Sequence, residues 1–442
     1  MFSGFYGGVH PPAFKTSTSD RPIKRVFMPQ KVVLPLSQNV GSPAEPIVSA
    51  GDAVSVGSKI ARPSGFISSF LHATISGKVT KIAYSPTPAQ DRMLSIIIEA
   101  QGSEDQELKL MPARDISSFS RDELLNMVKE AGVVGLGGAA FPTHVKLSPP
   151  KTKPIDTVIL NGAECEPYLT CDHRLMLEKS KEILRGLEII NKILGVKKAF
   201  IAIEDNKLSA LYSMERALSA AKERGQAEGV EVMSVRTKYP QGAEKQIIKS
   251  VLNRTVPSGG LPMDVGCIVQ NMATTFAIYE AVYLKKPLIE RVVTITGDCV
   301  KEPVNLWVRI GTTLADLVNL LGVFVKEPKK IIAGGPMMGI AQHTMDIPIT
   351  KGTGGIVFLS GDRIDESKES VCIRCARCLE ACPMGLVPTV LMHRVKKGLF
   401  SEAKDLGIAQ CFECGACAYA CPAKIPLLDY MKFGKSKVQG AK

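Results

Sequence analysis

The pattern of hydrophobic and polar positions is most regular in the middle of the chain. Segments 156–160, 199–203 and 230–235 are rich in β-forming residues, and segments 173–194 and 206–225 between them carry apolar residues at helical spacing. This alternation of strands and helices predicts a parallel sheet. Ligands of such sheets bind beyond the carboxyl ends of the strands, so we expect a site in the loops there.

The N-terminal part of the chain has a different pattern. Residues 30–100 contain short β-like pieces separated by Gly-Asp and Ser-Gly turns, which predicts a small all-β domain. It resembles the barrel-sandwich domains of biotinyl and lipoyl carriers. Its stretch "SGFISSFLHATISG" lacks the carrier lysine, so we interpret it as a docking module. His72 has no second ligand nearby and is expected to pack or to lie at the surface.

On the other side of the central region, residues 291–322 predict two short strands, a turn and a helix that begins at Thr312 or Thr313. This segment resembles the β-grasp module called a soluble-ligand-binding domain. A structural spacer and a ligand-binding role are equally open for it. The polar stretch "SGDRIDESKES" that follows lacks periodicity and is expected to be a linker.

Eight of the twelve cysteines lie in two runs near the end of the sequence, "CIRCARCLEACP" and "CFECGACAYACP". Each run has the spacing C-x2-C-x2-C-x3-C-P of bacterial two-cluster ferredoxins, in which the fourth cysteine ligates the other cluster. A pair of zinc sites, which combine C-x2-C pairs across a longer spacer, fits these runs less well. We therefore expect two [4Fe–4S] clusters, one held by Cys372, Cys375, Cys378 and Cys421 and the other by Cys411, Cys414, Cys417 and Cys382.

The surroundings of these runs complete the predicted fold class, a multidomain α+β chain. Residues 387–407 between the runs have helical spacing, which favours a helical ferredoxin module. The four remaining cysteines are scattered without ligand spacing and are expected to be ordinary (Cys165, Cys171, Cys267 and Cys299). The expected domains are an all-β barrel-sandwich-like domain at 1–105, an α/β domain with a parallel sheet at 115–287, a β-grasp module at 288–360 and a two-cluster ferredoxin domain at 366–430.

A glycine-rich stretch, "GVVGLGGAAFPTHVK", precedes the first predicted strand of the central region. It follows a helix in which Ser120 and Glu123 form a capping box and which Gly132 ends. A dinucleotide fingerprint would follow a strand instead. The glycines let backbone N–H groups approach a phosphate or a flavin ring, and a lysine at the end can neutralise phosphate charge. The candidates are Gly135, Gly137, Gly138 and Lys146.

Three further polar loops are expected at the same sheet. "LNGAECEPYLTCDHR" follows the first strand, "YPQGAEKQ" follows the third, and "VQNMATT" comes later. Any one of them could be a capped helix start or a satisfied polar loop, but together they surround one sheet. Their candidate binding residues are Asn161, Glu164, Glu166, Tyr239, Gly242, Glu244, Gln270, Asn271 and Thr274.

Charge and hydropathy narrow the class of protein. The formal net charge is +12, but there is no block of like charge and no aromatic interleaving, so we do not expect nucleic-acid binding. No apolar run approaches the length of a membrane span, and the first residues lack the apolar core of a signal peptide. A soluble or peripheral protein on the cytoplasmic side is the expectation.

The four loops carry a resemblance to a known family. "GLGGAAFPTHVK", "NGAECEP", "YPQGAEKQ" and "QNMATT" occur in the order seen in the flavin-bearing, NADH-oxidising subunit of respiratory complex I. With "GFYGGVHPP" and the paired cluster motifs, the chain resembles more fully the C subunits of the Rnf electron-transport complexes. The resemblance implies noncovalent FMN in these loops, NAD(H) stacking near Phe141 and Glu166, and membrane association through partner subunits. Ala163 stands where the complex I subunits usually carry an aspartate, and Ala243 leaves Glu244 as the only acidic residue after "YPQG".

The resulting hypothesis is a peripheral electron-input subunit at the cytoplasmic face of the membrane. Electrons would pass between NAD(H), FMN and two [4Fe–4S] clusters, and integral membrane and iron–sulfur partner subunits would couple this to ferredoxin chemistry and ion translocation. No catalytic side chain is needed, since the flavin performs the hydride chemistry. Two alternatives are a soluble flavin and iron–sulfur cobalamin reductase of a metabolic microcompartment, and a non-catalytic iron–sulfur relay scaffold.

Overall fold

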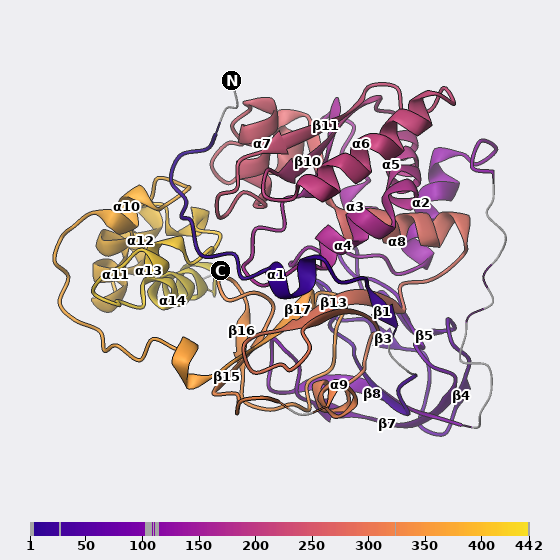
Figure 1. Ribbon diagram of the computed structural model, residues 1–442, viewed down its shortest axis with the longest axis horizontal. Helices are drawn as coiled ribbons and strands as arrows, with labels where there is room; N and C mark the ends of the chain where they lie inside the picture. The colour runs from indigo at the N-terminus through magenta and orange to yellow at the C-terminus, as the bar shows by residue number, and fades with distance from the viewer. Residues whose placement is uncertain are drawn as a thin grey trace.

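The computed structural model describes residues 4–25, 28–101, 108, 110, 115–322 and 324–440. Figure 1 shows a barrel-sandwich domain and a β-grasp sheet below an α/β domain, with a helical module to one side. The multidomain α+β class predicted from the sequence is confirmed. The segment that precedes α1 (Thr16–Ser19) runs between the helical module and the rest of the molecule.

The barrel-sandwich domain has two small antiparallel sheets. One has the strand order β2-β8-β7-β4 and the other β3-β5-β6. Their apolar faces meet in a core that includes Val32, Ile60 and Ile98. His72 packs inside this domain, and burial lowers its pKa to about 3. The strands are β2 (Lys31–Pro35), β3 (Glu45–Pro46), β4 (Ala53–Val54), β5 (Lys59–Arg62), β6 (Leu71–His72), β7 (Gly77–Ser85) and β8 (Met93–Ala100).

The α/β domain contains the predicted parallel sheet, in the order β11-β10-β9-β12. Its strands are β9 (Thr157–Gly162), β10 (Lys198–Glu204), β11 (Val230–Val235) and β12 (Cys267–Asn271). The fourth strand is a difference from the sequence pattern, which indicated a loop at "VQNMATT". Gln270 and Asn271 belong to the end of β12, and Thr274 lies in the first turn of the helix that follows.

Helices of this domain begin where local capping favours them. Ser120 and Glu123 form both hydrogen bonds of the capping box predicted for α2 (Arg121–Glu130). The predicted helix 173–194 is divided into two, α4 (Cys171–Glu178) and α5 (Ser180–Leu194), at Lys179. The other helices are α3 (Thr143–Lys146), α6 (Leu208–Lys222), α7 (Glu244–Leu252), the 3-10 turn η1 (Pro262–Val265) and α8 (Met272–Tyr283).

The β-grasp sheet has the order β1-β14-β13-β17-β15-β16. Its edge strand comes from near the N-terminus: Lys24 and Arg25 pair in parallel with Leu306 and Trp307. Its helix α9 (Leu314–Leu321) begins after Thr313, whose side chain caps it. The strands are β1 (Lys24–Arg25), β13 (Glu290–Thr296), β14 (Val304–Arg309), β15 (Lys330–Ala333), β16 (Ile340–Gln342) and β17 (Gly355–Leu359).

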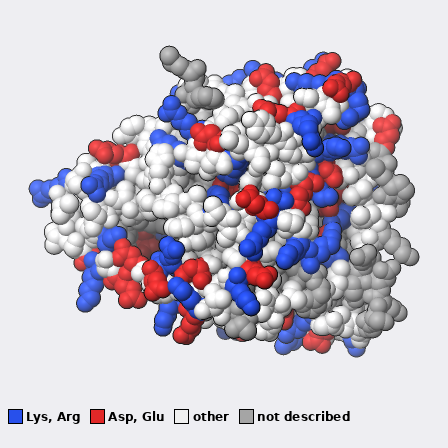
Figure 2. Space-filling view, viewed as in Figure 1, with Lys and Arg blue, Asp and Glu red and all other residues white. Residues whose placement is uncertain are grey.

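The C-terminal module is helical, as the spacing of residues 387–407 predicts. After the 3-10 turn η2 (Gly361–Arg363), its elements are α10 (Arg377–Glu380), α11 (Pro388–Lys396), α12 (Phe400–Asp405), η3 (Ile408–Gln410), α13 (Ala416–Tyr419) and α14 (Leu427–Gly440). No helix in the described part of the chain is long and apolar enough to cross a membrane. On the face drawn in Figure 2, basic and acidic side chains are interspersed.

Candidate functional site

The glycine-rich stretch forms a loop between α2 and α3, residues 132–142, which we call the glycine loop. It packs against the start of α8. The N–H of Gly135 donates a 2.8 Å hydrogen bond to the carbonyl of Phe141, and the N–H of Leu136 donates one of 2.8 Å to the hydroxyl of Thr274. A side chain at Gly137 would place its Cβ 3.1 Å from the Asn271 side chain. Glycine is therefore what allows the loop to approach the end of β12 this closely.

The outer side of this loop is open. Gly138 has a φ of 139° and free space where a Cβ would lie, and both Gly137 and Gly138 are exposed. Among the described residues, no group accepts the N–H of either glycine. The side-chain nitrogen of Gln270 is buried and also lacks a partner within the described ranges. The unpaired N–H groups of Gly137 and Gly138 on the open side of the loop fit an electron-rich ligand such as a flavin phosphate or ring edge.

Asn271 links the glycine loop to a residue that the sequence did not single out. Its side-chain oxygen accepts a 3.1 Å hydrogen bond from the N–H of Thr274, and its side-chain nitrogen donates a 2.6 Å bond to Asp172. Burial raises the pKa of Asp172, and the bond from Asn271 opposes that shift. An acidic residue in the first turn of a helix is ordinary helix chemistry, so nothing in the sequence marked Asp172 as part of a site.

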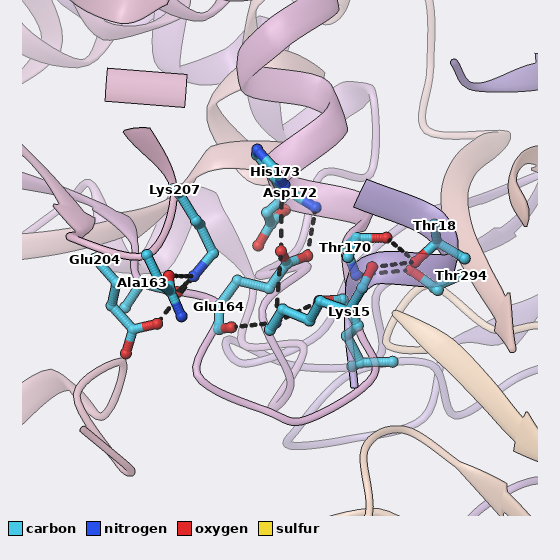
Figure 3. Close-up of polar contacts among 12 residues, drawn as sticks. Lys15, Thr18, Ala163, Glu164, Thr170, Asp172, His173, Glu204, Lys207 and Thr294 are labelled. Atoms are coloured by element: carbon cyan, nitrogen blue, oxygen red, sulfur yellow. Dashed lines mark hydrogen bonds and ion pairs between the residues drawn. The ribbon is translucent and has the colours of Figure 1, made fainter. Parts of the chain in front are cut away.

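The Glu164 carboxylate is buried and points to the start of α4 (Figure 3). It accepts hydrogen bonds from the N–H groups of Asp172 (2.6 Å) and His173 (3.2 Å) at the start of α4. Lys15 of the N-terminal segment donates a 2.7 Å bond to the Glu164 carbonyl, and its ammonium lies 3.9 Å from the carboxylate. Burial raises the pKa of Glu164 to about 7. The structure thus places this predicted binding residue in a buried network that shapes the loop.

The carbonyl of Ala163, next to Glu164, is held by a buried ion pair (Figure 3). Lys207 donates a 2.7 Å hydrogen bond to this carbonyl and a 2.9 Å bond to the Glu204 carboxylate. Both side chains of the pair are 2% exposed or less. A buried pair of this kind fixes geometry, because removing one partner leaves an uncompensated charge.

Glu166 joins the α/β domain to the β-grasp domain. Its two carboxylate oxygens accept hydrogen bonds from the N–H groups of Met337 (3.0 Å) and Met338 (2.9 Å) in the loop between β15 and β16. Gly335 packs against it so closely that a Cβ there would lie 2.2 Å from a carboxylate oxygen. Burial raises the pKa of Glu166 to about 7 and outweighs the two hydrogen bonds, which lower it.

The "YPQGAEKQ" loop meets both the glycine loop and the cysteine module. The Asn161 side chain donates a 2.7 Å hydrogen bond to the carbonyl of Gly242, and Lys146 forms an ion pair with Glu244. Tyr239 lies elsewhere: it is buried, and its hydroxyl donates a 2.7 Å bond to the carbonyl of Cys414. The structure therefore gathers the glycine loop, Asn161, Gly242 and Glu244, and turns Tyr239 toward the second cysteine run.

The first cysteine set lines a cavity of about 940 Å³ at the surface of the helical module. Its lining includes three cysteines of the first run and the last cysteine of the second run, namely Cys372, Cys375, Cys378 and Cys421. Burial, hydrogen bonds and the neighbouring Cys421 act on Cys378, and the net effect raises its pKa. Cysteines from both runs thus line one cavity.

The second cysteine set lies deeper. Burial, followed by the neighbouring thiols of Cys411 and Cys382, raises the pKa of Cys414 to about 12. The pKa of Cys417 is also raised to about 12, by burial and by the thiols of Cys414, Cys411 and Cys382. In the described ranges, no group of three or more His, Cys, Asp or Glu side chains is arranged to hold a single metal ion. The crossing of Cys382 and Cys421 fits two clusters, each with ligands from both runs.

Comparison with known families assigns each part of the chain. Residues 128–280 match the model of the Nuo51 FMN-binding domain, residues 3–103 the RnfC barrel sandwich hybrid domain, residues 292–341 the SLBB domain and residues 371–425 the 4Fe-4S dicluster domain. The fold and the site together define a flavin and iron–sulfur electron-transfer subunit.

Curated relatives give the family. The chain is 47% identical, over all of its length and 95% of the relative, to the C subunit of the proton-translocating ferredoxin:NAD(+) oxidoreductase complex of Clostridium ljungdahlii. It is 41% identical, over 91% of its length and 89% of the relative, to the C subunit of the Na(+)-translocating complex of Acetobacterium woodii. The chain belongs to the RnfC family, the C subunits of these ion-translocating oxidoreductase complexes.

A solved structure shares the fold alone. The crystal structure of an NAD+-reducing [NiFe]-hydrogenase in the H2-reduced state aligns with a TM-score of 0.51 and 17% sequence identity. The alignment covers 75% of this chain and 63% of the hydrogenase chain.

Proposed function

We propose that this chain is the peripheral electron-input subunit of an Rnf-type complex and exchanges electrons between NAD(H), FMN and two [4Fe–4S] clusters. When bound, FMN converts between a two-electron hydride and the single electrons that clusters carry. The observation that carries the proposal is the hydrogen bond of 2.7 Å between Tyr239 and the Cys414 carbonyl, because it joins a loop of the flavin domain directly to a cysteine run.

The flavin-binding residues of this proposal are those around the open glycine loop. The backbone N–H groups of Gly137 and Gly138 would donate to an electron-rich group of FMN. Thr274, which accepts from the N–H of Leu136 and is itself held by Asn271, would keep the loop against the start of α8. Lys146 forms an ion pair with Glu244, so it would neutralise an FMN phosphate only by exchanging this partner for the phosphate. NAD(H) would stack near Phe141, with Glu166 shaping the neighbouring wall.

The two cysteine sets have different places in the proposed path. The set that contains Cys382 and Cys414 lies against the N-terminal segment and the α/β domain. The N–H of Gly8 in the segment donates to the Ala381 carbonyl (2.9 Å), and the Gln246 side chain of the α/β domain donates to the Pro383 carbonyl (3.3 Å). The set that contains the exposed Cys375 lines the surface cavity. We assign the inner set to exchange with the flavin and the outer set to exchange with a partner.

The partners in this proposal are integral membrane and iron–sulfur subunits at the cytoplasmic face of the membrane. Support comes from the relatives, which are named as one subunit of ion-translocating ferredoxin:NAD(+) oxidoreductase complexes. Ion movement would belong to those partners. Copurification with membrane subunits would separate this role from that of a soluble cobalamin reductase.

The test is anaerobic purification followed by flavin and iron analysis and by titration with NADH. We expect one FMN and two clusters for each chain, and bleaching of both the flavin and the cluster absorbance by NADH. If the protein contains iron but takes up no FMN on reconstitution, the result would contradict the proposal and favour the non-catalytic iron–sulfur relay scaffold.

A further inference from the structure

Two buried cations of the β-grasp domain lie under the glycine loop of the neighbouring domain. Arg291 on β13 and Lys351, shortly before β17, are each 2% exposed. One Arg291 nitrogen donates a 3.1 Å hydrogen bond to the carbonyl of Leu136, and another donates to the carbonyl of Lys351. The Lys351 ammonium donates a 2.7 Å bond to the carbonyl of Gly132. Both cations thus hold the beginning of the glycine loop through its carbonyl groups.

Neither cation forms an ion pair among the described residues. Apart from Gly132, the Lys351 ammonium contacts the Phe70 carbonyl (2.8 Å) and the Ser69 hydroxyl (3.5 Å) of the barrel-sandwich domain. Asp172 is a charged neighbour of Arg291, but its carboxylate accepts a hydrogen bond from Asn271. Burying a cation without a paired carboxylate costs free energy, and burial lowers the pKa of Lys351 to about 7.

The two hydrogen bonds from Arg291 and Lys351, here called the clamp, also determine the direction of N–H groups on the opposite side of the loop, because each peptide group is planar. The carbonyl of Leu136 and the N–H of Gly137 belong to one peptide group and point in opposite directions. Because Arg291 binds the Leu136 carbonyl from the side of the β-grasp domain, the N–H of Gly137 faces away from that domain. Gly352 covers the next part of the loop, since a Cβ there would lie 3.3 Å from the Gly138 carbonyl. The carbonyls of Leu136 and Gly138 are therefore covered from the β-grasp side, and the N–H groups of Gly137 and Ala139, which belong to the same two peptide groups, face away from it.

We propose that Arg291 and Lys351 are positioning residues for the flavin: they fix the glycine loop so that the N–H of Gly137 faces an electron-rich group of FMN. This inference rests on the proposed flavin function. It gives the β-grasp module a role that is neither that of a passive spacer nor that of a separate ligand receptor. The module is a clamp that sets the shape and the positive potential of a binding loop in another domain.

The experiment compares Lys351→Met and Arg291→Met with a matched control, Lys286→Met. Lys286 is also a buried lysine of this part of the chain, but its ammonium pairs with Glu280 (2.6 Å) and Glu290 (2.7 Å) and has no hydrogen bond to the glycine loop among the described residues. Three readouts are used: hydrogen exchange of the glycine-loop amides in flavin-free protein, the Kd for FMN, and the midpoint potential of bound FMN. Arg291→Lys and Lys351→Gln, which each keep a hydrogen-bond donor group, are the second variants if a methionine variant does not fold.

We expect the amides of Gly135 and Leu136, which are hydrogen-bonded to Phe141 and Thr274, to exchange faster in the two clamp variants. The variants should also bind FMN at least about tenfold more weakly, as loss of a charged hydrogen bond implies. The potential of FMN that remains bound should become more negative in Arg291→Met, because a nearby cation stabilises the charge of the reduced flavin. In Lys351→Met the same shift should appear below about pH 7, where the wild-type lysine is protonated. Lys286→Met should lower thermal stability and leave the Kd unchanged. The inference would be overturned if the hydrogen exchange of the loop amides, the Kd for FMN and the FMN midpoint potential of both clamp variants equalled those of the wild type. If the wild type itself does not bind FMN, the proposed function is overturned. Hydrogen exchange of the loop amides in flavin-free protein would still show whether Arg291 and Lys351 fix the loop.

Discussion

The hydroxyl of Tyr239 donates a 2.7 Å hydrogen bond to the backbone carbonyl of Cys414, and this bond connects the flavin domain with the inner cysteine set. Tyr239 is buried, and its backbone also pairs with Val9 of the N-terminal segment. Three parts of the chain that are distant in sequence therefore meet at one tyrosine. The relative position of the two electron-transfer sites depends on this junction.

Tyr239→Phe removes the hydroxyl and leaves the buried carbonyl of Cys414 without its partner. We expect a loss of about 1–3 kcal/mol in the free energy of unfolding. The midpoint potential of the inner cluster should become more negative, because a hydrogen-bond donor beside a ligand stabilises the reduced state. Potentiometric titration followed by electron paramagnetic resonance checks this. A change in the outer cluster with no change in the inner one would contradict the assignment of the two sets.

Gly137→Val places a branched side chain where a single Cβ already lies 3.1 Å from Asn271. We expect FMN retention to be lost while the iron content stays that of the wild type. The control is Gly361→Ala, where the nearest atom to the added Cβ is at 3.8 Å. Equal loss of FMN and iron in the valine variant would mean that the protein misfolds, and full FMN retention would remove the glycine loop from the flavin site.

The crossing of the cysteine ligands predicts which pairs of substitutions act on the same cluster. Cys375 and Cys421 line one cavity, whereas Cys414 lies in the inner set. Replacing Cys375 and Cys421 together by Ser should remove about half of the iron. Replacing Cys414 and Cys421 together should affect both clusters. The opposite pattern, measured by iron analysis and electron paramagnetic resonance, would show that each run holds its own cluster.

The buried carboxylate of Glu166 predicts a pH dependence of stability. Its pKa is raised from 4.5 to about 7, so the folded state holds a proton that the unfolded state releases near pH 4.5. Stability from this group is present below about pH 4.5 and is lost as the pH rises to about 7, by about 3 kcal/mol in total. Between pH 5 and 7 the melting temperature of the wild type should fall relative to that of Glu166→Gln. Above pH 7 the difference between the two melting temperatures should stay constant. A difference that is constant over the whole range would show that Glu166 remains ionised throughout.

Local signals in the sequence predicted the elements and the fold class. The capping box at Ser120 and Glu123, the helix start at Thr313 and the three central strands depend on neighbouring residues alone, and the structure contains each of them. The spacing of the cysteine runs is a similar local signal. It yields the ligand assignment, which stays a prediction.

Long-range contacts could not be predicted in the same way. β1 joins a sheet whose other strands begin at Glu290, and nothing in the two residues Lys24 and Arg25 indicates this pairing. Glu164 has the residue type of a ligand contact, but a lysine at position 15 and the start of α4 direct its carboxylate inward. Arg291 and Lys351 belong to no motif, because their partners are backbone carbonyls of another domain.

The most direct test of the proposed function is rapid mixing of NADH with anaerobic protein that has been stripped of flavin, before and after FMN is restored. Cluster reduction is followed by absorbance and by electron paramagnetic resonance of frozen samples. We predict that flavin-free protein keeps both clusters oxidised in the presence of NADH and that restoring FMN allows their reduction. Reduction of the clusters by NADH without flavin, or no reduction after FMN has bound, would contradict electron input through the glycine-loop site.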